Sequence, residues 1–122
     1  MAKFEIKDGV AIIPEGTTEI GHSAFSGCSS LTSIVIPDSV TSIGWCAFQY
    51  CSSLTSVVII GNGVTSIEDS AFKGCESLTS LVIGNGVTNI GEEAFDGCTS
   101  LKQDPTQEIE MSNIKYRLLM HN

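Results

Sequence analysis

The sequence predicts a right-handed repeat solenoid, mostly β with short helical turns, and with capped ends. Three observations predict it. A frame of identical residues recurs at a nearly constant spacing, apolar and polar residues alternate inside each copy, and both chain ends depart from the frame. One coil of such a repeat cannot bury its apolar side alone, so successive coils are expected to stack. The connections between their parallel strands are expected to be right-handed.

Five residue types recur in register through four copies of Ile-x-x-x-Ala-Phe-x-x-Cys, each followed by a Leu. The Phe residues are spaced by 23, 24 and 23 positions, and the other four ladders keep the same spacings. The ladders are Ile20, Ile43, Ile67 and Ile90; Ala24, Ala47, Ala71 and Ala94; Phe25, Phe48, Phe72 and Phe95; Cys28, Cys51, Cys75 and Cys98; and Leu31, Leu54, Leu78 and Leu101. The one extra residue lies in IIGNGV (59–64), where a Gly-Asn-Gly turn can absorb it because Gly tolerates positive φ.

Each copy also contains one predicted inward-facing strand. In LTSIVI (31–36) the apolar residues at the first, fourth and sixth positions point inward, and alternation turns Ser33 and Val35 outward. Val40 and Ile43 are expected to point inward from the opposite wall. The Ala-Phe-x-x-Cys segment is expected to form a short helical turn with Phe and Cys inside. The strands then stack as a parallel sheet at about 4.8 Å per coil.

The stretch CSSLTSIVIPDSVTSIGWCAFQYCSSLTSVVI (28–59) resembles the BspA-like leucine-rich repeats, which have about 23 residues per coil. The resemblance covers about residues 14–101. It implies a leucine-rich-repeat coil and a non-enzymatic binding scaffold of cell-surface or secreted proteins that act in cell adhesion and host interaction. It therefore implies a protein partner, extracellular or from a host.

The N-terminal end departs from the frame. The segment FEIKDGVAII (4–13) has two short β-rich runs around a Lys-Asp-Gly turn. We therefore predict that residues 1–17 form an N-terminal cap, consisting of a hairpin and a partial coil. Residues 18–103 are predicted to form the solenoid of about four coils.

Residues 104–122 are predicted to form a non-repeat C-terminal cap, for which two alternatives remain. Asp104 as N-cap with Pro105 at the first helical position would begin a helix. Alternatively, apolar residues that alternate around Ser112 and Asn113 would form a hairpin. Non-repeat residues at both ends predict a complete, capped domain, because the open ends of a solenoid need covering.

The charge balance argues against nucleic acid as a partner, and the lack of a long apolar run argues against membrane insertion. The chain has 122 residues, a net charge of −8 and six Lys plus Arg, so it is an acidic protein without the basic face that nucleic acid needs. Its longest apolar run, residues 57–60, is too short to insert into a membrane. The first sixteen residues have no apolar core of a signal peptide. The localisation is therefore unknown from the residues alone, and this absence favours an intracellular protein-interaction scaffold as an alternative.

The cysteines could suggest a metal or a disulfide. Stacked coils could bring two ladder thiols within disulfide range. However, parallel side chains in a straight row do not converge on a tetrahedral zinc, so we expect no metal and no cofactor. Cys46 lies outside the ladder at a position expected to be exposed, and it could be an inert surface thiol or a reactive one. A thiol-dependent redox sensor or catalyst at Cys46 is therefore a further alternative.

No catalytic residues are predicted, and we expect that the protein is not an enzyme. A nucleophile needs a neighbouring base, and the chain offers only His22 and the terminal His121. A pair of His22 with Cys46 is conceivable, but no orienting acid is identifiable. The late acidic residues lack the spacing of a calcium loop and are predicted to be a solvated face.

One copy of the frame is decorated. In IGWCAFQYC (43–51), Trp45 is the chain's only Trp, and Tyr50 stands where the other copies have Gly. Because Trp and Tyr supply most binding hot spots, this edge is the candidate partner-binding site. It consists of Trp45, Tyr50, His22, Cys46, Glu68 and Asp69. Trp45 could instead pack on its neighbouring coil, or the edge could mediate self-association.

A second surface is the outer face of the predicted sheet, which is uncharged and regular. Its residues are Ser33, Val35, Ser56, Val58, Ser80 and Val82. This face could bind a flat, extended partner. It could equally reflect β-propensity alone. The sequence thus predicts a macromolecular-recognition module that binds proteins.

Overall fold

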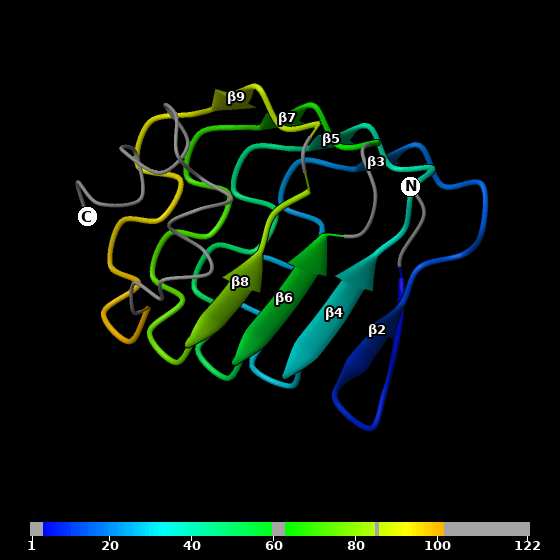
Figure 1. The fold of residues 1–122 in the computed structure, drawn as a ribbon. Coiled ribbons are helices and arrows are strands. Elements are labelled where there is room, and N and C mark those ends of the chain that lie inside the picture. Colours follow the sequence, from blue (N-terminus) through cyan, green and yellow to red (C-terminus); the bar gives the residue numbers. More distant parts are fainter. Residues whose placement is uncertain (1–3, 60–62, 85, 102–122) are drawn as a thin grey trace.

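The structure is a computed structural model that describes residues 4–59, 63–84 and 86–101. The described residues form short strands on two walls around one interior (Figure 1). The strands are β1 (Glu5–Lys7), β2 (Val10–Ile12), β3 (Glu19–Ile20), β4 (Ser33–Ile36), β5 (Ser42–Ile43), β6 (Ser56–Ile59), β7 (Ser66–Ile67), β8 (Ser80–Val82) and β9 (Asn89–Ile90). We call the strand pairs β2/β3, β4/β5, β6/β7 and β8/β9 coils 1 to 4.

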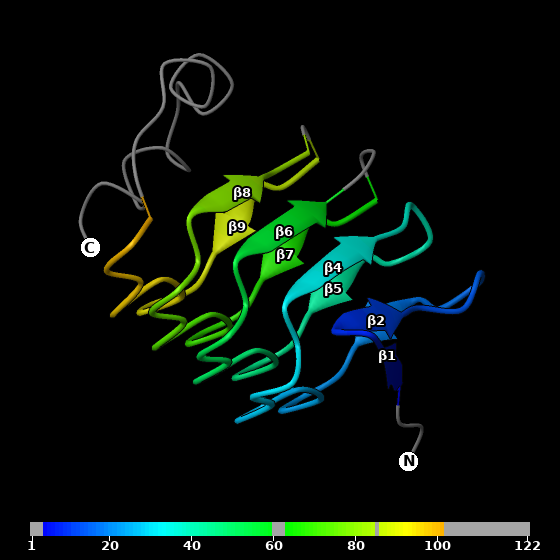
Figure 2. The ribbon, with the colours of Figure 1, turned by 90° about the horizontal axis from the view of Figure 1, so that it is seen from below.

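From β2 onward, each strand pairs in parallel with the equivalent strand of the next coil. One sheet has the order β1-β2-β4-β6-β8 and the other has the order β3-β5-β7-β9. The register joins equivalent residues, so Ile34 lies opposite Val57 and Ile43 lies opposite Ile67. Figure 2 shows the coils stacked side by side along one axis. The predicted repeat solenoid with a parallel sheet is therefore confirmed.

The alternation inside each coil follows from burial against the opposite wall. In coil 2, Leu31, Ile34 and Ile36 are buried from one wall, and Val40 and Ile43 are buried from the other. Equivalent residues of coils 3 and 4 join the same cluster, so a single apolar core runs along the stacking axis. One position of this core is identical in all four coils, namely Ile20, Ile43, Ile67 and Ile90, whereas another changes from Ala11 to Ile34, Val57 and Leu81.

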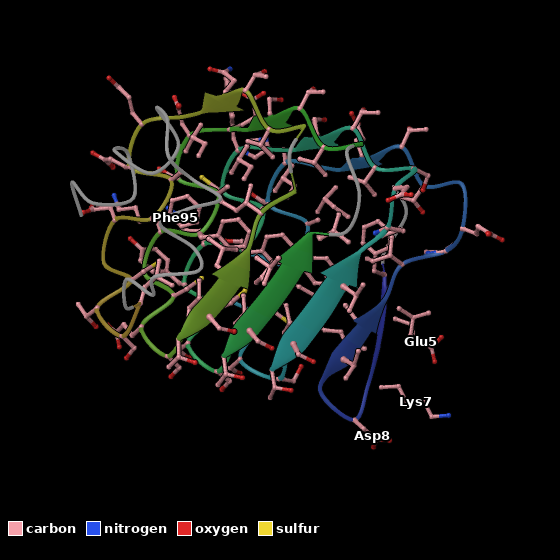
Figure 3. All side chains as sticks on the ribbon, in the orientation of Figure 1. Glu5, Lys7, Asp8 and Phe95 are labelled. Atoms are coloured by element: carbon pink, nitrogen blue, oxygen red, sulfur yellow. The ribbon has the colours of Figure 1, made fainter. Side chains whose placement is uncertain are left out.

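The centre of this core is a ladder of phenylalanine rings. The ring centroids of Phe25 and Phe48 lie 5.2 Å apart, those of Phe48 and Phe72 lie 4.9 Å apart, and those of Phe72 and Phe95 lie 5.4 Å apart. The ring planes differ by 7° or less. Figure 3 shows Phe95 inside the coil. Phe4 stacks on Phe25 at 5.5 Å and extends the ladder toward the N-terminus, which the repeat frame did not predict.

Threonine residues form two further ladders on the outside. The hydroxyl group of Thr55 donates a hydrogen bond of 3.1 Å to the carbonyl oxygen of Thr32, which also accepts one from the Thr55 amide. Thr65 bonds to Thr41 in the same way on the other wall. Each side-chain hydrogen bond of this kind contributes about 1 kcal/mol. The Thr ladders therefore stabilise the stack of coils, and their hydroxyl groups are already engaged.

The N-terminal segment forms a hairpin. β1 pairs antiparallel with β2, and the turn between them places Asp8 at φ 52° and Gly9 at φ 83°. Such a turn favours the Asp-Gly pair, because both central residues need positive φ. Glu5, Lys7 and Asp8 extend away from the core (Figure 3). Charged side chains on an edge strand prevent pairing with another chain, so β1 ends the sheet at this side.

The expected short helical turns are wrong for the described residues, which contain no helix. The Ala-Phe-x-x-Cys segments are series of turns, in which the Ala47 amide bonds to Gly44 and the Gln49 amide bonds to Cys46. The reason is backbone geometry, since Cys46 has φ 58° and Tyr50 has φ 61°. A left-handed residue every four positions interrupts a right-handed helix.

Several predictions fall outside the described residues. These are the C-terminal cap at 104–122, in both its helical and hairpin forms, and the centre of the insertion at 60–62. The boundaries of the caps and of the solenoid remain predictions. Within the described ranges, no helix has the length and apolarity that crossing a bilayer requires.

The Phe ladder generates a first prediction. Phe48→Ala should lower the free energy of unfolding by about 3–5 kcal/mol, because the fully buried ring lies between two others. Phe4→Ala should cost less, about 1–2 kcal/mol, because Phe4 is half-buried and has one stacking neighbour. Urea unfolding, monitored by circular dichroism, measures the free energy of unfolding of both variants. Equal losses would show that the ladder is not what holds the coils together.

Candidate recognition surface

Backbone hydrogen bonds align equivalent positions of the four coils into rows. The Ser23 amide donates to the Trp45 carbonyl at 2.9 Å, the Cys46 amide to Asp69 at 3.2 Å, and the Ser70 amide to Glu92 at 3.0 Å. We call the aligned residues His22, Trp45, Asp69 and Glu92 the position-45 row. All four side chains are exposed. The row therefore forms one continuous strip of surface along the stacking axis.

Trp45 contacts the preceding coil. The centroids of its ring and of the His22 ring lie 5.9 Å apart in an edge-to-face arrangement with an interplanar angle of 71°. Trp45 nevertheless remains 56% exposed, so this packing leaves most of the indole accessible. The sequence prediction placed His22 beside Trp45, and the structure brings them together.

Tyr50 contacts the following coil. It belongs to a second row, Gly27, Tyr50, Gly74 and Gly97, which we call the position-50 row. The Tyr50 amide donates to the Lys73 carbonyl at 2.7 Å, and its ring lies over Gly74, where an added Cβ would collide with the ring. Tyr50 is 55% exposed. Among the described residues there is no ring contact between Tyr50 and Trp45, so the two aromatic side chains point to opposite neighbours.

Tyr50 occupies a conformation that disfavours it. All four residues of the position-50 row have positive φ, and Tyr50 has φ 61°. Glycine adopts this conformation without penalty, whereas an L-residue with a Cβ loses about 1–2 kcal/mol. Coils 1, 3 and 4 have Gly at this position. Coil 2 therefore carries an exposed aromatic residue at a cost in stability.

Cys46 lies beside Trp45, but it is half-buried and not fully exposed as predicted. It takes the other left-handed position of its turn, with φ 58°, as Ser23, Ser70 and Glu93 do in their coils. In the described part of the chain, no hydrogen bond joins its thiol to His22. The structure thus does not assemble a nucleophile–base pair from these two residues.

Acidic residues continue the surface into coils 3 and 4. Glu68 is half-buried and accepts a hydrogen bond of 3.2 Å from the Ser66 hydroxyl. Asp69 is exposed, and its Oδ1 accepts a bond of 2.8 Å from the Glu92 amide. Lys73 forms an ion pair of 3.0 Å with Glu93. The hydrogen bond and the charge of Glu93 raise the pKa of Lys73 above its usual value.

The outer face of the first sheet is a separate surface. Val35 and Val82 are 47% and 44% exposed. Beside them, Ser56 pairs with Ser33 on one side and with Ser80 on the other. The side chain of Val58 lies outside the described part of the structure. The face extends further than predicted, because Ile12 of β2 is 46% exposed. The sequence VAI (10–12) could have predicted this exposure. Ala11 pairs with Ile34 and faces inward, so the alternation along the strand turns Ile12 outward.

Three of the four ladder cysteines are buried, and none is in a disulfide. All five cysteines are free, and Cys51, Cys75 and Cys98 are buried. The thiol of Cys51 donates to the Phe25 carbonyl at 3.0 Å, and Cys75 and Cys98 repeat this bond one coil further on. Hydrogen bonds with Cys51 and then Cys98, followed by burial, hold the pKa of Cys75 well above its usual range. These thiols are therefore structural hydrogen-bond donors.

Metal ligands do not gather in the part of the chain that the structure covers. No group of three or more His, Cys, Asp or Glu side chains converges there on a point where an ion could be held. The sulfurs of Cys51, Cys75 and Cys98 are each directed at a carbonyl oxygen of the coil before. What the arrangement offers instead is an exposed aromatic edge on a rigid scaffold.

The fold and the surface together define a repeat-protein recognition module. Comparisons with known proteins assign it to a family. Residues 8–121 match the model of the BspA type leucine-rich repeat region. The chain belongs to this family, whose proteins are typically non-enzymatic binding modules. The resemblance seen in the sequence is thereby confirmed.

Solved structures of bacterial leucine-rich repeat proteins are similar. The T. pallidum leucine-rich repeat protein TpLRR has a TM-score of 0.73 and 32% identity over 88% of this chain and 50% of its own. A leucine-rich repeat protein of Bacteroides ovatus has a TM-score of 0.65 and 39% identity over 71% of this chain and 22% of its own. A leucine-rich cell surface protein of Faecalibacterium prausnitzii has a TM-score of 0.55 and 32% identity over 86% and 35%.

The chain thus spans half or less of the length of these similar structures. No curated protein matches it. The similarity therefore assigns the family and the repeat architecture, and the recognition surface is argued from the residues of this chain.

The left-handed position of Tyr50 generates a second prediction. Tyr50→Gly should leave the free energy of unfolding unchanged or raise it by up to about 1 kcal/mol, because Gly relieves the strained backbone. Gln49→Gly is the matched control. Gln49 is not among the residues with positive φ, so Gly there should lower stability by about 0.5–1 kcal/mol. Thermal and urea unfolding compare the two. A clear loss of stability in Tyr50→Gly would mean that the ring serves the fold.

The cysteine geometry generates a third prediction. Iodoacetamide applied to the native protein should alkylate the half-buried Cys28 and Cys46 well before the buried Cys51, Cys75 and Cys98. The buried thiols lack solvent access and donate to carbonyl oxygens, and thiolate is the reactive form. Peptide mass spectrometry after timed labelling measures each site. Rapid alkylation of Cys75 in the folded protein would contradict the structural role.

Proposed function

We propose that this chain binds a protein partner through the edge of coil 2, at Trp45 and Tyr50. The observation that carries the proposal is the exposed Tyr50 ring at φ 61°, in a row where every other coil has Gly. Exposed residues that cost stability are found at functional sites, where another selective advantage maintains them. The rest of the coil follows the repeat, so this edge is what distinguishes coil 2.

The chemistry of the edge suits a protein partner. Trp and Tyr combine a large apolar area with a polar atom and few rotatable bonds, which is why they dominate binding hot spots. The two rings lie on a scaffold held by stacked backbone hydrogen bonds, so little ordering is needed on binding. Catalysis has no support from the described residues, since Cys46 and His22 are not joined. We therefore propose a binding protein that is not an enzyme.

We further propose an adhesion-type role outside the cell, with an extracellular or host protein as partner. Support comes from the similar cell surface protein of F. prausnitzii and from the family itself. An intracellular scaffold would use the same edge with a partner from the cell's own contents. The source of the captured partner decides between the two.

The test is an affinity capture with matched variants, and it is the fourth prediction. Immobilised protein is exposed to host extracellular extract and to lysate of the source cell. The double variant Trp45→Ala/Tyr50→Gly should lose at least about tenfold in affinity for the captured protein, because hot-spot truncation costs 2 kcal/mol or more. The control variant Val35→Ser/Val82→Ser alters two exposed apolar side chains on the other surface and should bind normally.

Each outcome is informative. Aromatic-dependent capture from extracellular extract supports the adhesion role, and aromatic-dependent capture from lysate supports the scaffold. Capture that survives in the aromatic variant and fails in the valine variant would refute the proposal and move the binding site to the outer face of the first sheet. Circular dichroism of both variants verifies that they are folded.

A further inference from the structure

The position-45 row changes chemistry along the solenoid axis. It begins with the rings of His22 and Trp45 and continues with the carboxylates of Asp69 and Glu92. Successive members are one coil apart, which is about 4.8 Å. An exposed indole is thus followed, at one and two coils, by two exposed carboxylates. A ligand that follows the row meets an aromatic face first and negative charge next.

These carboxylates have no cationic partner among the described residues. Between positions 18 and 101 the sequence contains a single Lys and no Arg. That Lys73 is already paired with Glu93 at 3.0 Å. Asp69 accepts one hydrogen bond, from the Glu92 amide, and no ion pair involves either Asp69 or Glu92 in the described part of the chain. Within the described residues, no basic side chain therefore neutralises the negative charge of the row.

We propose that the partner presents an extended, Arg- or Lys-rich segment that lies along the position-45 row. This inference rests on the proposed function and names the class of partner. One cationic side chain lies on the exposed face of Trp45 as a cation–π contact. In an extended chain the side chain two residues further on is about 6.6 Å away, which falls between the one-coil and two-coil positions of Asp69 and Glu92. One segment can therefore engage the indole and both carboxylates together.

The charge of the surface argues against other macromolecular occupants. Nucleic acids and anionic lipid headgroups carry negative charge, so Asp69 and Glu92 would repel them. A second copy of this chain would bring a net charge of −8 toward the same acidic row. A basic peptide segment is the complementary partner for an aromatic and acidic strip.

The experiment uses Trp45 itself as the reporter, because it is the only Trp in the sequence. The full chain is titrated with acetyl-Arg-Ser-Arg-Ser-Arg-Ser-amide while Trp fluorescence is excited at a wavelength that Tyr does not absorb. The control peptide has Gln in place of Arg. We expect a saturable change in Trp45 emission with the Arg peptide alone. Raising the salt from about 20 to about 200 mM should weaken binding several-fold, because exposed charges are screened.

Matched charge variants provide the fifth prediction. Asp69→Asn/Glu92→Gln keeps the size of each side chain and, at Asp69, an oxygen that accepts the Glu92 amide. It should weaken the Arg peptide by about three- to tenfold, as expected for two exposed ion pairs. Glu15→Gln/Asp38→Asn removes the same charge at exposed positions in the loops that join the two walls. That variant should bind within twofold of the original chain, roughly the effect of distant, screened charges.

The proposal is overturned by an unchanged Trp45 spectrum at millimolar Arg peptide, by equal binding of the Gln peptide, or by equal losses in the two charge variants. If the charge variants were unfolded, the peptide comparison and the salt series on the original chain would still decide. Repeating the affinity capture with the charge variant tests this inference separately from the proposed function. Loss of capture in the aromatic variant, together with full capture in Asp69→Asn/Glu92→Gln, refutes the cationic segment alone.

Discussion

Hydrogen bonds between equivalent positions of successive coils constrain the rest of this structure. They hold the coils one strand spacing apart, and at that spacing a residue mainly meets its own equivalent in the next coil. Flat rings can stack at such a distance, and the five phenylalanines do so with centroids 4.9–5.5 Å apart. Thr hydroxyls and Cys thiols reach the carbonyl groups of the neighbouring coil. The repetition of the sequence is thus a direct consequence of the stacking geometry.

The same constraint makes deviations from the repeat interpretable. A position that is Gly in most coils, because its backbone is left-handed, can carry another side chain only with strain. Tyr50 is such a case, and its ring lies over Gly74 because that position has no side chain. Trp45 departs in a different way, since its row has no backbone requirement and is exposed in every coil. Together they place two exposed aromatic side chains on coil 2, while Ala47, Phe48 and Cys51 of the same segment stay buried in the core.

Most of the fold could be predicted from the sequence, because the apolar residues that recur at the same position of each repeat indicate which side chains point inward. The alternation in LTSIVI (31–36) and the Gly residues aligned with Tyr50 can both be seen in the sequence once the repeat is aligned. The left-handed conformation of Ser23, Cys46, Ser70 and Glu93 could not be predicted, since none of these residues is glycine. That missed feature is why turns replaced the expected helical segments. The thiol–carbonyl bonds and the stacking of Phe4 depend on distances across coils, which spacing along the chain does not reveal. The divergence of Trp45 and Tyr50 toward opposite neighbours has the same origin.

We propose that the repeat builds a scaffold and that the partner binds to coil 2 and to the acidic part of the position-45 row. Amide chemical-shift mapping by nuclear magnetic resonance tests this most directly, with the captured partner added stepwise to the labelled chain. We expect shifts concentrated at residues 22–23, 45–50, 68–70 and 92–93, with the amides of β4, β6 and β8 nearly unaffected. Shifts concentrated on those three strands instead would contradict it, and would assign recognition to the flat outer face of the first sheet.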